Sequence, residues 1–174
     1  MTEQTTHSTR RPTHHAIVDS PIGPLTLIAD DDAIVEVRFP NHSGDPAAAL
    51  GDSVLDPDHP VIARASAQLA EYFAGTRTEF DLPLAPAGTP FQVAAWRALS
   101  TIPYGETVSY GEQATRLGDP RKARAVGAAN GRNPIALIVP CHRVIGANGA
   151  LTGYAYGVDR KRALLELEGV LLAA

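Results

Sequence analysis

The chain has 174 residues, of which 44% are hydrophobic and 20% are charged, and its net charge is −4. This length allows a sizeable hydrophobic core and at most two small domains. A single cysteine excludes an internal disulfide, and with it a small secreted fold stapled by disulfides. Because no apolar run approaches the roughly 20 residues that span a bilayer, we expect a cytoplasmic protein with no membrane partner.

The charge is divided unevenly along the chain. Residues 1–90 carry 5 Lys and Arg against 13 Asp and Glu, whereas residues 91–174 carry 10 against 6. This asymmetry indicates an acidic scaffold beside a basic working half, which would suit a polyanion such as nucleic acid. Ordinary scatter of surface charge is the alternative explanation.

The first half of the chain is predicted to form a small α+β unit. Residues 1–15 are polar and lack the apolar core of a signal peptide, so we expect a disordered N-terminal lead. Residues 20–40 predict a β-hairpin that turns at Asp30–Asp32, and residues 61–74 have the spacing of an amphipathic helix. We therefore place an N-terminal α/β domain at residues 16–86.

The second half, residues 89–174, is predicted to be mostly helical. Its predicted elements are helices at 91–102, 110–118, 121–131 and 158–169, and a strand at 135–139. Thr89 and Ser109 are the expected N-caps of the first two helices, and Asp159 of the last. The second and third helices are short and joined by a tight Gly-Asp-Pro turn, which is typical of a helix-turn-helix.

The third helix is unusual for a protein that reads the major groove of DNA. One face carries only small residues beside two arginines: Ala125, Gly127, Ala128, Ala129 and Gly131, with Arg121 and Arg124. Long side chains that would reach base edges are scarce. Small residues suit close approach to a narrow groove or to the DNA backbone, and burial against a neighbouring helix explains them equally well.

The only cysteine, Cys141, lies in the segment IALIVPCHRVIG, residues 135–146. A lone cysteine is more often a small buried hydrophobe than a nucleophile. Here Pro140 ends the predicted strand, so the thiol falls in a loop, and the cationic neighbours His142 and Arg143 favour the thiolate. Adjacent residues on an extended chain point apart, so a Cys–His contact would need a bridging water or a bend.

The sequence predicts neither a metal site nor a cofactor. None of the six histidines pairs with a second cysteine or with another ligand at helical spacing. The run Asp30–Asp32 is better explained as a solvated hairpin turn than as a metal cluster. No glycine-rich phosphate loop is present in the sequence.

Three motifs together resemble those of the O6-alkylguanine-DNA alkyltransferase family: PCHRV at 140–144, SYGE at 109–112 and RAVGAANGRNP at 124–134. The resemblance extends over nearly the whole chain. It implies a ribonuclease-H-like N-terminal domain followed by a winged helix-turn-helix that enters the minor groove. Such proteins flip an alkylated guanine out of double-stranded DNA, and the cysteine keeps the alkyl group, so each molecule acts once.

The resemblance also implies a role for each residue of the acceptor site. Cys141 would be the nucleophile, with His142 as its base through a water and Glu168 orienting the histidine. Asn133 would brace the acceptor loop, while Arg143 would be structural. The substrate would be O6-alkylguanine, chiefly with a methyl adduct, and also O4-alkylthymine. We expect a monomer in solution, with cooperative binding on DNA left open.

Further residues would contact the DNA and the flipped base. Tyr110 would donate a proton to the leaving guanine and crowd the neighbouring phosphate, while Arg124 would fill the gap left in the duplex. The small residues Ala125, Ala128, Ala129 and Gly131 would lie against the DNA. The guanine pocket would comprise the carbonyl of Val144, the backbone around Ala155, and Tyr154 as a wall.

The chain departs from the family pattern in two places. Many relatives carry only small residues after the pocket tyrosine, whereas here Tyr156 follows Ala155. We expect Tyr156 to narrow the pocket, so that methyl adducts are accepted and benzyl-sized adducts are disfavoured. Some relatives bind a structural zinc through cysteines, which the single cysteine excludes here.

Three other functions compete with this interpretation. A relative that recognises damage without repairing it would lack the cysteine that this chain has. A Cys–His hydrolase would turn over repeatedly and would leave the RAVGAANG helix unexplained. A regulator switched by its own methylation would carry additional DNA-binding and metal-binding regions, for which the chain is too short.

Overall fold

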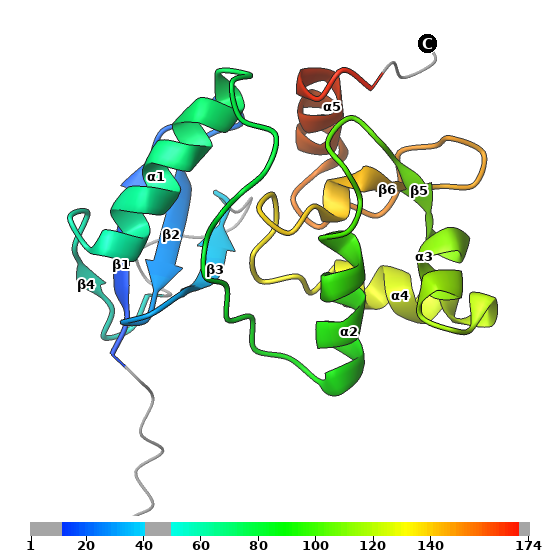
Figure 1. Ribbon diagram of the computed structural model, residues 1–174, viewed down its shortest axis with the longest axis horizontal. Coiled ribbons are helices and arrows are strands. Elements are labelled where there is room, and N and C mark those ends of the chain that lie inside the picture. Colours follow the sequence, from blue (N-terminus) through cyan, green and yellow to red (C-terminus); the bar gives the residue numbers. More distant parts are fainter. Residues whose placement is uncertain (1–11, 41–49, 171–174) are drawn as a thin grey trace, which may run out of the picture.

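The computed structural model describes residues 12–40 and 50–170, which form an N-terminal sheet with one covering helix and a mostly helical C-terminal half (Figure 1). The sheet contains β1 (His14–Val18), β2 (Leu25–Ala29), β3 (Ile34–Arg38) and β4 (Val54–Leu55), in the order β3-β2-β1-β4. The first three strands are antiparallel neighbours, and β4 runs parallel to β1. The mixed α+β class is therefore confirmed.

The predicted hairpin of β2 and β3 is confirmed, and its turn is built by Asp30. The Asp30 carboxylate accepts hydrogen bonds from the backbone N–H groups of Asp32 (3.0 Å) and Ala33 (2.9 Å). An aspartate that bonds the backbone in this way favours a turn. The predicted disordered lead extends too far, because β1 already begins at His14. Its residues 1–11 lie outside the described part of the chain.

Helix α1 (Pro60–Phe73) confirms the predicted helix at 61–74 and packs on the sheet. Proline at its first position suits a helix start, and Gly75 follows its C-cap with φ 74°. Its buried face includes Ile62, Leu69 and Tyr72. This face covers one side of the sheet and turns Tyr72 toward the other half of the molecule, as described below.

The C-terminal half is built from α-helices that are shorter than α1, together with 3₁₀ turns and two short strands. Its elements are α2 (Pro90–Leu99), β5 (Val108–Ser109), α3 (Tyr110–Arg116), the 3₁₀ helix η2 (Pro120–Lys122), α4 (Ala123–Asn130), the 3₁₀ helix η3 (Cys141–Arg143), β6 (Val144–Ile145) and α5 (Val158–Leu167). Thr89 and Ser109 cap α2 and α3 in complete capping boxes with Gln92 and Glu112, as predicted for the two caps. The parallel pair β5–β6 places Val144 beside Val108.

Two predicted local structures in this half are wrong. Residues 135–139 form a buried turn instead of a strand, with Leu137 at φ 80° and a hydrogen bond from Val139 N–H to the Ile135 carbonyl (2.9 Å). A short apolar run indicates burial but does not distinguish a strand from other buried backbone. The N-cap of α5 is Gly157, and Asp159 lies in the first turn, where its charge still suits the helix dipole.

The packing of α2, α3 and α4 depends on buried polar contacts. Gln113 of α3 and Asn130 of α4 exchange two amide hydrogen bonds, at 3.1 and 2.7 Å. The Trp96 indole donates to the Ala129 carbonyl at 2.9 Å. Buried amides with satisfied partners fix one arrangement of the helices, because any other would leave polar groups unsatisfied.

Hydrogen bonds and a ring contact join the two halves. The Val37 N–H of β3 donates to the Pro134 carbonyl at 2.8 Å, and Arg160 of α5 donates to the Ile22 carbonyl at 2.9 Å. The rings of Phe39 and Tyr156 stack with centroids 4.2 Å apart. None of the helices in the described residues is sufficiently long and apolar to cross a membrane.

Candidate active site

Cys141 and His142 share the single turn of η3 directly after Pro140. The backbone is therefore bent at this point, which is one of the two ways that the sequence left open for Cys141 and His142 to interact. The Asn133 side chain braces the segment that leads to this turn. Its amide nitrogen donates to the Val139 carbonyl (2.8 Å), and its amide oxygen accepts from the Ile135 N–H (3.1 Å). Cys141 is only 6% exposed, so its thiol lies inside the protein.

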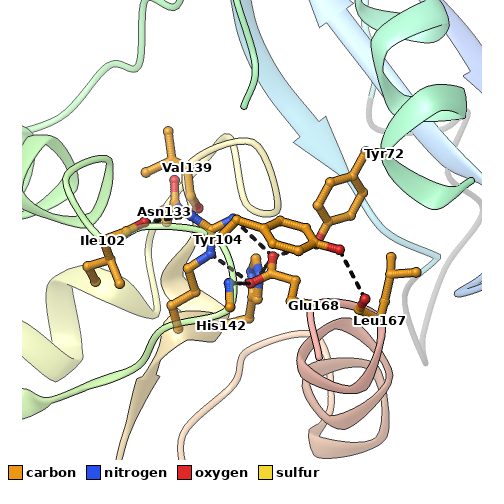
Figure 2. Close-up of polar contacts among 10 residues, drawn as sticks. Tyr72, Ile102, Tyr104, Asn133, Val139, His142, Leu167 and Glu168 are labelled. Atoms are coloured by element: carbon orange, nitrogen blue, oxygen red, sulfur yellow. Dashed lines mark hydrogen bonds and ion pairs between the residues drawn. The ribbon is translucent and has the colours of Figure 1, made fainter. Parts of the chain in front are cut away.

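The carboxylate of Glu168, just after α5, is the centre of a buried polar network (Figure 2). It lies 2.8 Å from His142 Nε2 and accepts two hydrogen bonds from Arg143, at 2.9 and 3.0 Å. It also accepts from the Tyr72 hydroxyl at 2.6 Å. Side chains of an arginine, a histidine and a tyrosine thus contact this carboxylate. They satisfy the hydrogen-bonding capacity of its oxygens, and the arginine neutralises its charge.

These contacts determine which groups are charged. Burial alone would raise the pKa of Glu168, but hydrogen bonds from His142 and Arg143 outweigh it and lower that pKa to about 2. Burial lowers the pKa of His142, although Glu168 opposes this. At neutral pH Glu168 is therefore ionised and His142 is neutral.

The ring of His142 is left with one nitrogen that can accept a proton. An ionised carboxylate only accepts hydrogen bonds, so Nε2 of the neutral ring carries the hydrogen that faces Glu168. The lone pair is then on Nδ1, which is buried and has no hydrogen-bond partner among the described residues. Such a nitrogen is suited to act as a general base.

The thiol needs such help to ionise. Burial raises the pKa of Cys141 to about 11, and interactions with Asn133 and Lys161 lower it only in part. A thiol with this pKa is almost fully protonated at neutral pH. The arrangement of a buried thiol, a neutral histidine and an ionised glutamate has the components of an activated nucleophile.

A groove on the C-terminal half lies over α4 and the start of α3. It is lined by Tyr110, Arg121, Lys122, Ala123, Arg124, Ala125, Gly127, Ala128, Thr152 and Gly153. Tyr110 packs over Gly127, where an added Cβ would lie 3.6 Å from the tyrosine ring, and its hydroxyl donates to the Thr152 carbonyl at 3.0 Å. The groove therefore combines three basic side chains with small residues and a tyrosine.

The sequence of this chain matches two family models. Residues 13–86 match the ribonuclease-like domain of 6-O-methylguanine DNA methyltransferase, and residues 90–170 match its DNA-binding domain. The chain belongs to the 6-O-methylguanine DNA methyltransferase family. The resemblance inferred from the sequence motifs is thereby confirmed.

Named relatives of this methyltransferase cover most of its length. The methylated-DNA–protein-cysteine methyltransferase of Mycobacterium tuberculosis is 54% identical over 155 residues, covering 89% of this chain and 92% of that protein. The enzyme of the same name from Methanosarcina acetivorans is 53% identical over 156 residues, covering 90% and 98%. The crystal structure of M. tuberculosis OGT in complex with DNA matches with a TM-score of 0.82 at 54% identity, covering 89% of this chain and 92% of that chain.

Most predicted DNA-contact residues of this methyltransferase line the groove, but two do not. Tyr110, Arg124, Ala125 and Ala128 are among its lining residues. Ala129 is only 3% exposed and its carbonyl accepts from Trp96, so the prediction that it lies against DNA is wrong. It occupies the buried face of α4. Gly131 is exposed at the C-cap, outside the groove lining.

The predicted pocket residues differ in their surroundings. Val144 and Tyr154 are buried, and the Tyr154 hydroxyl has no hydrogen-bond partner in the described residues. Ala155 is exposed. Tyr156 is held in place, because its hydroxyl donates to the Asn133 carbonyl at 3.2 Å and its ring contacts Tyr154 edge-on at 5.6 Å.

Sequence reasoning missed two residues of the site. Tyr72 is contributed by α1 of the N-terminal half and reaches Glu168, 96 positions away. It has the spacing of an ordinary core residue, so the sequence holds no signal for this contact. Lys161 is also missed, although a lysine on the apolar side of a predicted helix is unusual. Arg143, predicted to be structural, forms an ion pair with the Glu168 carboxylate.

The absence of a metal site stays a prediction. Among the described residues, three side chains of metal-binding type come together on the N-terminal half: His14, Asp31 and His59, with ligand atoms within 4.8 Å of one another. His14 Nδ1 lies 3.2 Å from Asp56, and its ring stacks on His59 at 4.4 Å. These contacts also explain the group as a cluster of polar contacts and stacked rings at the start of β1.

Proposed function

We propose that this methyltransferase repairs DNA by moving an alkyl group, chiefly methyl, from O6 of guanine to Cys141, once per molecule. The observation that carries the proposal is the buried thiol of Cys141 beside a neutral His142 whose Nε2 faces the ionised Glu168. A thiol in this setting stays protonated until His142 removes its proton. O4 of thymine, with the same kind of alkyl–oxygen bond, is a second substrate of the same chemistry.

The proposed reaction is a single displacement at the alkyl carbon. A water passes the thiol proton to His142 Nδ1, and Sγ attacks the alkyl carbon as the carbon–O6 bond breaks. The departing guanine gains a negative charge and takes a proton from the Tyr110 hydroxyl, which later recovers one from His142 through solvent. The products are a thioether on Cys141 and an unmodified guanine, and the described residues of the site offer no group that would cleave the thioether.

We propose that double-stranded DNA binds a monomer of the protein along the groove over α4. The support is the groove itself, where Arg121, Lys122 and Arg124 surround small residues and leave room for a close approach. In this proposal α3 and α4 form the helix-turn-helix, with α4 in the minor groove, and the lesion is flipped toward Cys141.

The stoichiometry tests the proposed function directly. Increasing amounts of protein are mixed with a duplex that carries one O6-methylguanine, and the remaining lesion is counted. We expect one lesion to be lost per protein molecule, with a sharp end point. Continued loss beyond one equivalent would contradict the proposal and indicate a turnover enzyme.

Arg124→Ala is expected to weaken binding to lesion-containing DNA about tenfold more than binding to undamaged DNA. Arg124 is exposed on α4, and in the proposal it fills the space that the flipped base leaves, which exists only in the lesion complex. Gel-shift titrations with matched duplexes measure both affinities.

Arg121→Ala is the matched control, because Arg121 lines the same groove and is exposed. As a phosphate contact it should weaken both complexes by the same factor. Equal losses for Arg124→Ala on the two duplexes would reassign Arg124 to the phosphate backbone.

Tyr156→Gly is expected to raise the rate with O6-benzylguanine DNA at least tenfold relative to the rate with O6-methylguanine DNA. The Tyr156 ring is fixed between Phe39 and Tyr154, so it cannot swing aside easily for a large adduct. Single-turnover rates on the two duplexes give the ratio. An unchanged ratio would show that Tyr156 does not limit adduct size.

A further inference from the structure

The side chain of Tyr72 crosses from the N-terminal half of the molecule into the acceptor site (Figure 2). It belongs to α1, it is fully buried, and its hydroxyl donates to Glu168 Oε1 at 2.6 Å. A phenylalanine would fill the same core position without a polar atom that needs a partner. Packing therefore explains the ring of this residue but not its hydroxyl.

Tyr72 and His142 contact the same oxygen of the Glu168 carboxylate. His142 Nε2 lies 2.8 Å from Oε1, the atom that also accepts from Tyr72. Arg143 donates to both oxygens, from Nη2 to Oε1 at 3.0 Å and from Nε to Oε2 at 2.9 Å. The oxygen that faces the histidine is thus held from both halves of the molecule.

The Tyr72 hydroxyl acts on this oxygen only as a donor. Burial and the negative charge of Glu168 raise the pKa of Tyr72 far above its usual value, so the hydroxyl keeps its proton. A hydrogen bond donated to a carboxylate disperses part of its charge, and the carboxylate then stabilises a neighbouring imidazolium less. Tyr72 therefore weakens the hold of His142 on a proton.

The other titratable groups that face His142 or Tyr72 belong to the C-terminal half: Glu168, Arg143, Lys161, Cys141, Tyr104 and Tyr154. Burial lowers the pKa of His142, Glu168 opposes this, and the positive charges of Arg143 and Lys161 add to the lowering. Burial raises the pKa of the thiol and of the two other tyrosines, so these groups are uncharged at neutral pH. Among these described groups, Tyr72 is thus what the N-terminal half contributes.

We propose that Tyr72 is a positioning residue for alkyl transfer: its hydroxyl holds the Glu168 oxygen against His142 and limits the pull of that oxygen on a proton, so that the N-terminal half keeps His142 available as a base. This proposal rests on the proposed function. The competing explanation is a core tyrosine whose hydroxyl only adds stability. The two differ because only the first makes the protonation of His142 depend on the hydroxyl.

The first test compares Tyr72→Phe with the wild-type protein, without DNA. The ring signals of His142, assigned with the variant His142→Gln, are followed by NMR from pH 4 to pH 9. We expect the midpoint of His142 protonation to move to higher pH by about half a unit to one unit in Tyr72→Phe. A ring that titrates identically in the two proteins, or a midpoint moved to lower pH, would overturn the proposal.

Tyr104→Phe is the matched control, because it removes another tyrosine hydroxyl that reaches the end of α5. That hydroxyl donates to the Leu167 carbonyl at 3.0 Å, beside Glu168 but not to its carboxylate. The His142 midpoint should therefore stay at its wild-type value. A shift as large as that of Tyr72→Phe would overturn the assignment, because general loosening around the carboxylate would then explain both.

The repair reaction supplies the second readout. Methyl transfer by Tyr72→Phe should be about three- to tenfold slower than wild type at pH values below both midpoints, because one unit of pKa changes the fraction of free base tenfold. The difference should disappear above pH 8, where His142 is neutral in both proteins. A ratio of rates that is the same at every pH would overturn the proposal. Since the NMR titration contains no DNA, a failure of the proposed repair function leaves the Tyr72 assignment intact.

Should Tyr72→Phe fail to fold, 3-fluorotyrosine at position 72 decides the matter. It keeps the ring and the hydroxyl, but its more acidic hydroxyl is a stronger donor to the carboxylate. The His142 midpoint should then move to lower pH, opposite to the shift expected for Tyr72→Phe. A midpoint that stays or rises would overturn the proposal.

Discussion

Cys141→Ser abolishes alkyl transfer in our account, while the affinity for undamaged DNA stays within about threefold of the wild-type value. The chain has no second cysteine to accept the group, and a serine hydroxyl is far less nucleophilic than a thiolate. The side chain is buried and does not line the groove, so DNA contacts should be unaffected. Lesion loss and gel-shift titration measure the two properties.

The control for this variant is the wild-type protein with its thiol blocked by iodoacetamide. This protein should also fail to transfer the alkyl group. Its bulkier side chain is expected to weaken the binding of lesion-containing DNA, so only the transfer assay serves as the control. Residual transfer by Cys141→Ser at more than about 1% of the wild-type rate would contradict the account, because another residue would then be the acceptor.

Glu168→Gln is expected to slow methyl transfer by about 10- to 100-fold and to lower the free energy of unfolding at pH 7 by about 3 to 5 kcal/mol. The substitution leaves the buried Arg143 without its counter-charge and removes the carboxylate that orients His142. A less basic His142 accepts the thiol proton less readily, so the apparent pKa of Cys141 should rise. Urea denaturation, single-turnover kinetics and thiol titration measure the three changes.

The same residue predicts how acid destabilises the protein. The folded-state pKa of Glu168 is about 2, below its ordinary value of 4.5. The stabilisation from its ionised form is therefore complete above about pH 4.5 and is lost as pH falls toward 2. Between these values the wild-type protein should lose stability more steeply than Glu168→Gln, which has no such carboxylate.

Glu166→Gln is the matched control for both experiments, since Glu166 is exposed on the same helix. It should change the free energy of unfolding by less than about 0.5 kcal/mol. If Glu168→Gln behaved like this control in stability and in thiol titration, the proposed link from Glu168 through His142 to Cys141 would be removed.

The parts of the fold that follow from neighbouring residues were predictable from the sequence. The capping boxes at Thr89 and Ser109 involve residues three positions apart, and the hairpin turn depends on Asp30 and its next neighbours. The buried turn at 135–139 was mistaken for a strand, because five apolar residues report burial without fixing the backbone. Its shape depends on Asn133, which bonds the carbonyl of Val139 from outside the apolar run.

The acceptor site was only partly predictable, and the missing parts come from distant segments. The motif PCHRV identifies the nucleophile and its neighbour, and the family resemblance supplies Glu168. Nothing local indicates that Tyr72, in the other half of the molecule, donates to the same carboxylate. Similarly, small residues on α4 suggested one DNA-facing surface, but Ala129 faces Trp96. Sequence composition cannot show which of these residues face DNA when both faces of the helix carry small side chains.

The measurement that tests the central claim most directly is the intact mass of the protein after incubation with a duplex carrying one O6-methylguanine, followed by peptide mapping. The account predicts the addition of one methyl group, saturating at one per molecule and located on Cys141. Loss of the lesion with no change in protein mass, or a methyl group on any other residue, would contradict it.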